Sequence, residues 1–157
     1  TEPADIRDDS QDFAFQGDGF WFHGGAVVVE GNIASGCSGH GFIFWTEGIR
    51  EVGTPFDFQN MFLASNVPNG DLLGDLDQIG SWFVPLRSFR DNTAYSVAKG
   101  LAAYYVHTTQ FDDLYFLPQA YIDTMHSTLE DTTLWNVHMV GVELQNCERF
   151  TFAGLRF

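Results

Sequence analysis

The chain of 157 residues, 17.6 kDa, is long enough for one folded domain or for part of a larger one. Its formal net charge of −14, with one lysine and six scattered arginines, excludes nucleic-acid binding, because such a surface needs clustered cations to displace counterions. At 45% hydrophobic and 18% charged residues it is too apolar for a disordered tail, and no stretch reaches the ~20 apolar residues of a membrane span.

Residues 17–44 contain the first of several repeated units. The segment 17–22, GDGFWF, recurs as segment 39–44, GHGFIF, and the segment 89–95, FRDNTAY, aligns with 129–135, LEDTTLW. In each unit an Asn or Thr turn stands eight or nine residues before a glycine that opens the next strand. The turn residues are Asn32, Asn92 and Thr132, and the glycines are Gly41, Gly100 and Gly141. A short repeat built only from strands and turns predicts a parallel β-helix, a solenoid of roughly five rungs.

The residues after each glycine alternate with a period of two. The first and third positions are apolar in every unit, so we expect both columns to point inward and to stack from rung to rung. The first column is Phe20, Phe42, Leu101 and Val142, and the third is Phe22, Phe44, Ala103 and Leu144. The second and fourth positions accept residues of any kind and are expected to face outward. Asn32 and Asn92 should form an internal ladder in one turn.

Two segments interrupt the period. Residues 45–79 and 105–126 each follow a strand of the repeat, and each is too long for a plain rung. The first carries Gly and Pro loop signals, and the second is rich in aromatic residues. We expect both to be long loops that leave one edge of the solenoid side by side, where recognition residues usually lie. The C-terminal residues 150–157 continue as strand, which suggests either a single β-helix domain over residues 1–157 or a fragment of a larger one.

The repeats resemble those of a known group of proteins. The segments GDGFWF and VVVEGNIAS, residues 84–95 and residues 134–136 are similar to the right-handed parallel β-helix repeats that accompany G8 domains in hyaluronidase-like and fibrocystin-like families, and to repeats of large bacterial surface proteins. The resemblance covers most of residues 13–157 apart from the two insertions. It implies a right-handed β-helix in a secreted or cell-surface protein.

Four outward residues are candidates for substrate binding. Trp21, His23, Trp45 and Tyr104 occupy the second and fourth positions, and the aromatic rings would form a strip at the foot of the two loops. Sugar rings stack on such aromatic faces. The alternative is that the loops fold back and bury the rings.

Asp18 and His40 precede the glycines of neighbouring units and should lie one strand apart, within hydrogen-bond reach. The pair is either a structural ladder or, with a second converging charged group, an acid–base pair. Arg87 is a further catalytic candidate, because a β-helix lyase needs a base beside the uronate carboxylate. Salt bridges from Arg87 and Arg90 to Asp91 or Glu130 would explain the arginines equally well.

An acidic cluster lies in the first insertion. Asp71, Asp75 and Asp77, joined by Asp112 and Asp113 of the second insertion, present carboxylate oxygens of the kind that Ca²⁺ binds. Their spacing matches neither an EF-hand loop nor a calcium-roll repeat, so a solvated acidic loop is the alternative.

The two cysteines, Cys37 and Cys147, lack C-x-x-C spacing and are either one disulfide or two partly buried thiols. The function expected from the sequence is an extracellular β-helix module, structural or adhesive, that contacts polysaccharide or neighbouring subunits. The alternative is a polysaccharide-degrading lyase or hydrolase, or a fragment of one, in which acidic loop residues work with calcium and with His40 or an arginine.

Overall fold

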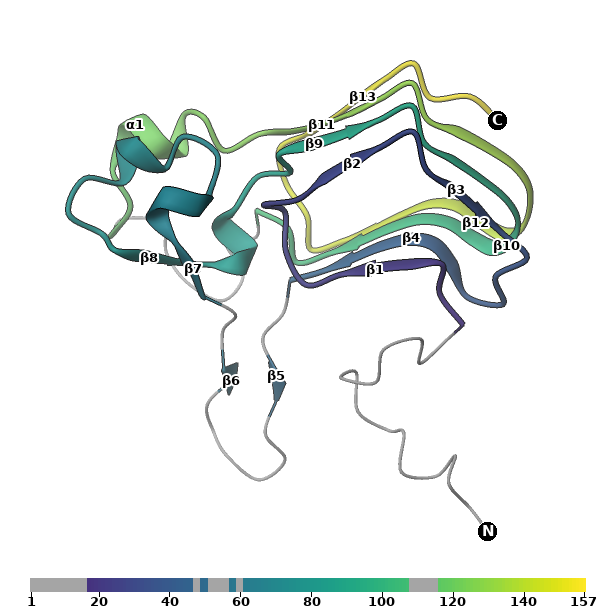
Figure 1. The fold of residues 1–157 in the computed structure, drawn as a ribbon, viewed down its shortest axis with the longest axis horizontal. Coiled ribbons are helices and arrows are strands. Elements are labelled where there is room, and N and C mark those ends of the chain that lie inside the picture. The colour runs from purple at the N-terminus through teal and green to yellow at the C-terminus, as the bar shows by residue number, and fades with distance from the viewer. Residues whose placement is uncertain (1–16, 47–48, 51–56, 59–60, 108–115) are drawn as a thin grey trace, which may run out of the picture.

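The computed structural model describes residues 17–46, 49–50, 57–58, 61–107 and 116–157 (Figure 1). Strands dominate these ranges, and the helical segments are short. The protein is therefore all-β, as its many short apolar stretches and sixteen glycines predict. None of the helices in the described part of the chain is long and apolar enough to cross a membrane.

Most strands belong to two parallel sheets, which we call sheet A and sheet B. Sheet A contains β1 (Phe20–Phe22), β4 (His40–Trp45), β10 (Thr93–Tyr104) and β12 (Thr133–Gln145) in that order, and β3 (Ile33–Ser35) pairs with the beginning of β10. Sheet B contains β2 (Val28–Glu30), β9 (Ser88–Arg90), β11 (Ser127–Glu130) and β13 (Phe150–Ala153) in that order. The chain passes repeatedly from one sheet to the other, and neighbours within each sheet follow the chain order (Figure 1).

The strand register in sheet A agrees with the repeat read from the sequence. Phe42 pairs with Phe20 on one side and with Leu101 on the other, and Leu101 pairs with Val142. In the third position Phe44 pairs with Phe22 and with Ala103, and Ala103 pairs with Leu144. The residues of each predicted column therefore lie opposite one another on neighbouring strands. Phe42 and Leu101 have exposed fractions of 0% and 1%, which places this row in the core between the sheets.

Stacked aromatic rings fill the core near β1 and β4. Phe20 and Phe42 lie 5.0 Å apart between ring centroids with nearly parallel planes, and Phe22 stacks on Phe44 at 4.9 Å. Phe89 of sheet B meets both Phe42 and Phe44 edge to face. Such offset and edge-to-face contacts add to the free energy gained from burying the rings. The phenylalanine-rich composition is thus explained by ring columns that tie sheet A to sheet B.

The corner between a sheet B strand and the following sheet A strand has the same form in successive passes. Its first residue is left-handed, with φ of 66° at Gly31, 55° at Asp91 and 43° at Asp131. The next residue is polar: Asn92 Oδ1 accepts a hydrogen bond from the Asn32 backbone N–H at 3.0 Å, and Asn92 Nδ2 donates to a backbone carbonyl. The predicted asparagine ladder is therefore present, and it satisfies backbone groups that the corner leaves unpaired.

The two insertions pack against one another as predicted, but they have structure of their own. They contain the antiparallel pairs β5 (Ile49–Arg50) with β6 (Asp57–Phe58) and β7 (Met61–Leu63) with β8 (Gln78–Gly80), the helix α1 (Gln119–Ile122), and 3₁₀ turns at Ala64–Asn66, Gly70–Leu73 and Ser81–Phe83. Residues of both segments form a second core: Val67, Leu73, Ile79, Trp82, Phe83, Val84, Leu117, Tyr121 and Met125. The first insertion thus continues past residue 79 to Val84.

Candidate functional site

Asp18 and His40 form a buried hydrogen-bonded pair on the outer side of sheet A. Asp18 Oδ1 accepts a hydrogen bond from His40 Nδ1 at 2.8 Å and another from the His40 backbone N–H at 2.7 Å. The two side chains are 4% and 2% exposed. The predicted contact between neighbouring units is therefore confirmed. Because Nδ1 carries the proton that Asp18 accepts, Nε2 of neutral His40 carries the lone pair, and it has no hydrogen-bond partner among the described residues.

The electrostatic surroundings favour the ionised form of Asp18. Burial raises the pKa of Asp18, but the two hydrogen bonds from His40 and the attraction of His40 and Lys99 outweigh burial and hold that pKa below its usual value. Asp18 therefore stays a carboxylate at neutral pH and fixes the orientation of the imidazole.

Three further polar side chains join this pair. Lys99 is the register neighbour of His40, and its Nζ lies 2.7 Å from Glu143 Oε2. Tyr104 donates a hydrogen bond to Glu143, and its ring lies 6.3 Å from the His40 ring, edge to face. We call these five residues the sheet A polar cluster. Glu143 adds a second carboxylate to the cluster, and this carboxylate is paired with Lys99.

Neighbouring side chains fix the charge states of Glu143 and Tyr104. The hydrogen bond from Lys99, reinforced by the one from Tyr104, lowers the pKa of the Glu143 carboxyl despite some desolvation. Burial, followed by the hydrogen bond to Glu143, raises the pKa of the Tyr104 phenol well above its usual value. The Tyr104 phenol is therefore a neutral donor, and the Glu143 carboxylate is an acceptor.

The four aromatic and imidazole residues predicted to bind substrate do not form one open strip. Tyr104 is buried, at 7% exposed, and its ring lies 4.9 Å from that of Trp45. Trp21 lies edge to face with His23 at 4.1 Å between centroids. Trp21, His23 and Trp45 are half-buried. Trp21, Trp45 and Tyr104 pack around the buried pair of Ile43 and Ala102, so the second column faces away from the main core but is largely covered. Their role in sugar binding stays a prediction.

The acidic residues of the first insertion are exposed and separate from the polar cluster. Asp71 lies in a 3₁₀ turn, and Asp75 and Asp77 follow it on the way to β8. Within the described ranges no group of three or more His, Cys, Asp or Glu side chains is placed to hold a metal ion. Asp112 and Asp113 lie outside the described residues. Calcium binding therefore stays a prediction.

Both cysteines are free and half-buried. Burial and the charge of Asp18 raise the pKa of the Cys37 thiol, and burial raises that of Cys147. Neither thiol is an activated nucleophile at neutral pH, because the thiolate is the reactive form.

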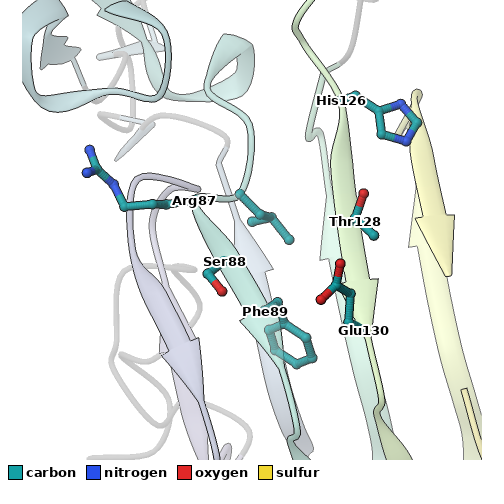
Figure 2. A pocket seen from close by; sticks show the side chains of 7 residues that line it. Arg87, Ser88, Phe89, His126, Thr128 and Glu130 are labelled. Carbon is teal, nitrogen blue, oxygen red and sulfur yellow. The ribbon is translucent and has the colours of Figure 1, made fainter. Parts of the chain in front are cut away.

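A polar groove lies on the outer face of sheet B, between β9 and β11 (Figure 2). Its volume is about 200 Å³, and β9, β11 and the residues just before them build it (Figure 2). Its lining consists of Leu86, Arg87, Ser88, Phe89, His126, Thr128 and Glu130. Outward side chains of neighbouring strands lie side by side in a parallel sheet, and this places Ser88 next to Thr128 across the groove. We call it the sheet B groove.

Some groove side chains are fixed and others are available to a ligand. The Arg87 guanidinium donates to the Asn66 carbonyl in the first insertion, and His126 Nε2 lies 2.7 Å from the Thr151 hydroxyl on β13. Among the described residues, the Thr128 hydroxyl and the Glu130 carboxylate have no hydrogen-bond partner. The groove thus offers a hydroxyl and a carboxylate held on strands, flanked by a positioned cation.

Arg87 therefore lies in the sheet B groove, on a different sheet from Asp18 and His40, and the three catalytic candidates do not form one site. Arg90 pairs with Glu30 at 3.0 Å across β9 and β2. Sequence reasoning missed the groove, although the alternation of Ser88, Arg90, Thr128 and Glu130 with buried residues carries the signal.

Comparison of the chain with models of protein families, with curated proteins and with solved structures finds no significant match. A functional assignment therefore rests on the fold, the sheet A polar cluster and the sheet B groove.

Proposed function

We propose that the protein is a right-handed parallel β-helix module of a secreted or cell-surface protein and that it binds polysaccharide. The strictly parallel pairing, the chain-order succession of strands in both sheets and the repeated corner at Gly31, Asp91 and Asp131 support the helix. Right-handedness follows from the strong preference of parallel crossovers for that hand. The extracellular location rests on the resemblance of the repeats.

The sheet B groove is the observation that carries the binding role. Its lining is mostly polar, and it lies between β9 and β11 (Figure 2), so an extended segment of a polymer can lie along these two strands. Hydroxyl and carboxylate groups such as those of Thr128 and Glu130 are suitable partners for the many hydroxyls of a sugar.

A neighbouring protein chain is the second partner that we propose for this module. The outward edge of β12 bears large exposed apolar side chains, among them Trp135 at 50% and Met139 at 71% exposed. Exposed apolar surface at a strand edge favours association with another polypeptide. An apparent mass far above 17.6 kDa in size-exclusion chromatography would identify this role.

The binding role is tested with a panel of neutral and uronate-rich polysaccharides, with and without Ca²⁺. We expect co-elution with at least one polymer, and a loss of affinity of about 3- to 10-fold for Thr128→Val and for Glu130→Gln, the size expected for one lost hydrogen bond each. Thr93→Val, on sheet A, is the matched control and should bind as the wild type does. Equal binding by all variants would place the polymer elsewhere. A dependence on Ca²⁺ that Asp75→Asn removes would establish the predicted calcium site.

Polysaccharide cleavage is the second candidate function, favoured by the sheet A polar cluster. His40 Nε2 has no hydrogen-bond partner among the described residues and would accept a proton in the neutral form of the ring, Asp18 would stabilise the resulting imidazolium, and the Tyr104 phenol is a proton donor beside Glu143. If this function operates, the polymers of the panel become shorter during incubation. His40→Gln should then lower the rate by 10²–10⁴-fold, the usual contribution of a general base, while co-elution persists. Unchanged polymer length under every condition would contradict cleavage, and polysaccharide binding would then be the remaining proposed function.

A further inference from the structure

A chain of hydrogen bonds lies directly beneath the sheet B groove. Ser127, the first residue of β11, is fully buried between His126 and Thr128, which both line the groove. Its Oγ lies 2.6 Å from His107 Nε2 and accepts a hydrogen bond from the Leu86 N–H at 2.9 Å. Leu86 also lines the groove. One hydroxyl thus joins the beginnings of the two segments that form the groove walls.

His107 is held in a site that suits only its neutral form. The residue is 1% exposed, its backbone N–H donates to the Trp82 carbonyl at 2.7 Å, and its ring packs against Phe150. Nδ1 is buried without a hydrogen-bond partner in the described ranges. Among the described residues, the charged or titratable side chains that act on the ring are Arg149, just before β13, and His126, just before β11, and both oppose a positive charge on it.

Protonation would place an N–H on Nδ1, which has no acceptor among the described residues, in a buried position near the Arg149 cation. Such a buried unpaired charge is among the costliest arrangements in a protein. Burial above all, and Arg149 and His126 to a lesser degree, lower the pKa of His107 to about 3. The neutral ring is therefore a condition for keeping Ser127 and Leu86 in place.

We propose that His107 is a positioning residue for the sheet B groove: it holds the two walls together through Ser127 and Leu86 at neutral pH and releases them in acid. An opened groove exposes His107 to water, where its pKa returns to the usual value of 6.5. Between that pH and about 3 the opened form binds one more proton than the closed form. The equilibrium constant for opening therefore rises by about tenfold for each unit that the pH falls.

The inference rests on the proposed function in one respect: the hydrogen bonds of Ser127 position the walls of the groove that is proposed to bind polysaccharide. Its consequence for a ligand is that affinity declines in acid as the closed form becomes less populated. The test below needs no ligand, so a failure of the groove to bind polysaccharide and a failure of His107 to control the walls are distinguishable.

The measurement is amide hydrogen exchange on the whole chain at Leu86 and Ser127 between pH 7.0 and 4.5, expressed as protection factors. In the wild type we expect protection at both amides to fall about tenfold per pH unit below pH 6.5, while the buried Ala102 amide of sheet A keeps its protection. His107→Gln should show lower protection at pH 7 and little further change in acid. His138→Gln, at an exposed position on β12, is the matched control and should follow the wild type.

Constant protection at Leu86 in the wild type would overturn the proposal, as would an equal decline in His107→Gln. If His107→Gln does not fold, the comparison within the wild type decides: a parallel decline at Leu86 and Ala102 is global unfolding and contradicts a local device, whereas a decline at Leu86 and Ser127 alone supports it.

Discussion

Replacing Asp18 with alanine should lower the free energy of unfolding by about 3–5 kcal/mol, the usual cost of removing one partner from a buried charged pair. The change leaves the His40 backbone N–H and Nδ1 without their shared acceptor in a site that is 2% exposed. Lys99 also loses a nearby carboxylate. Urea unfolding followed by tryptophan fluorescence measures the effect, and an unchanged slope with denaturant shows that the folded state is otherwise intact.

Asp18→Asn separates the hydrogen bonds from the charge. Its amide oxygen can still accept both bonds from His40, so the loss should be clearly smaller than that of Asp18→Ala. The pH dependence has a definite sign. Because the folded pKa of Asp18 lies below 3.8, its ionised form stabilises the fold fully above that pH, and the contribution is lost as the pH falls below it. Equal stability of Asp18→Ala and the wild type would show that the pair is exposed in solution.

Phe42→Ala should also lower the free energy of unfolding by about 3–5 kcal/mol, the typical cost of removing a buried aromatic ring. Phe42 is completely buried, and its ring stacks on Phe20 and meets Phe89 edge to face. The cavity lies at the junction of the two sheets, where paired backbones on both sides limit collapse. Chemical unfolding at 25 °C, with the same slope as the wild type, is the measurement.

Phe157→Ala is the matched control for Phe42→Ala, since Phe157 is 80% exposed. Its loss should stay within about 0.5 kcal/mol, as for most surface positions. A loss for Phe42→Ala as small as that of Phe157→Ala would contradict the stacked-ring core and the register that produces it.

The register could be predicted because it depends on spacing alone. Side chains in a strand alternate, so the apolar residues at Phe20, Phe42, Leu101 and Val142 identify one inward row once the glycines are aligned. The contact between Asp18 and His40 follows from the same alignment, because it joins equivalent positions of adjacent strands and needs no long side-chain reach.

The rest of the sheet A polar cluster could not be read in the same way. Lys99 lies opposite His40, but its ammonium reaches across to Glu143, and the Tyr104 phenol turns to the same carboxylate. Such contacts depend on rotamers of long side chains, which strand alternation does not specify. For the same reason the sequence suggested that Arg90 would pair with Asp91 or Glu130, whereas it pairs with Glu30.

The sequence predicted where the two insertions interrupt the repeat, but it did not predict that they share a hydrophobic core. Residues with helical or loop signals, such as Gly70 and Pro118, gave no indication that Leu73 and Tyr121 would share a core. That core forms from two segments far apart in the chain, and neither has enough apolar side chains of its own. Loop signals describe local backbone, whereas burial of this kind is set by how the strands bring the two segments together.

The two kinds of corner that connect sheet A with sheet B differ in the chain length that they accept. The corner from sheet B to sheet A always takes two residues, at 31–32, 91–92 and 131–132, while the corner from sheet A to sheet B takes 23–27, 46–87, 105–126 and 146–149. Closing a loop costs only about 0.6 kcal/mol for each doubling of its length. Long insertions should therefore accumulate at the second corner, so that the segments which connect sheet A to sheet B can be lengthened, shortened or exchanged while the paired strands beside them stay the same.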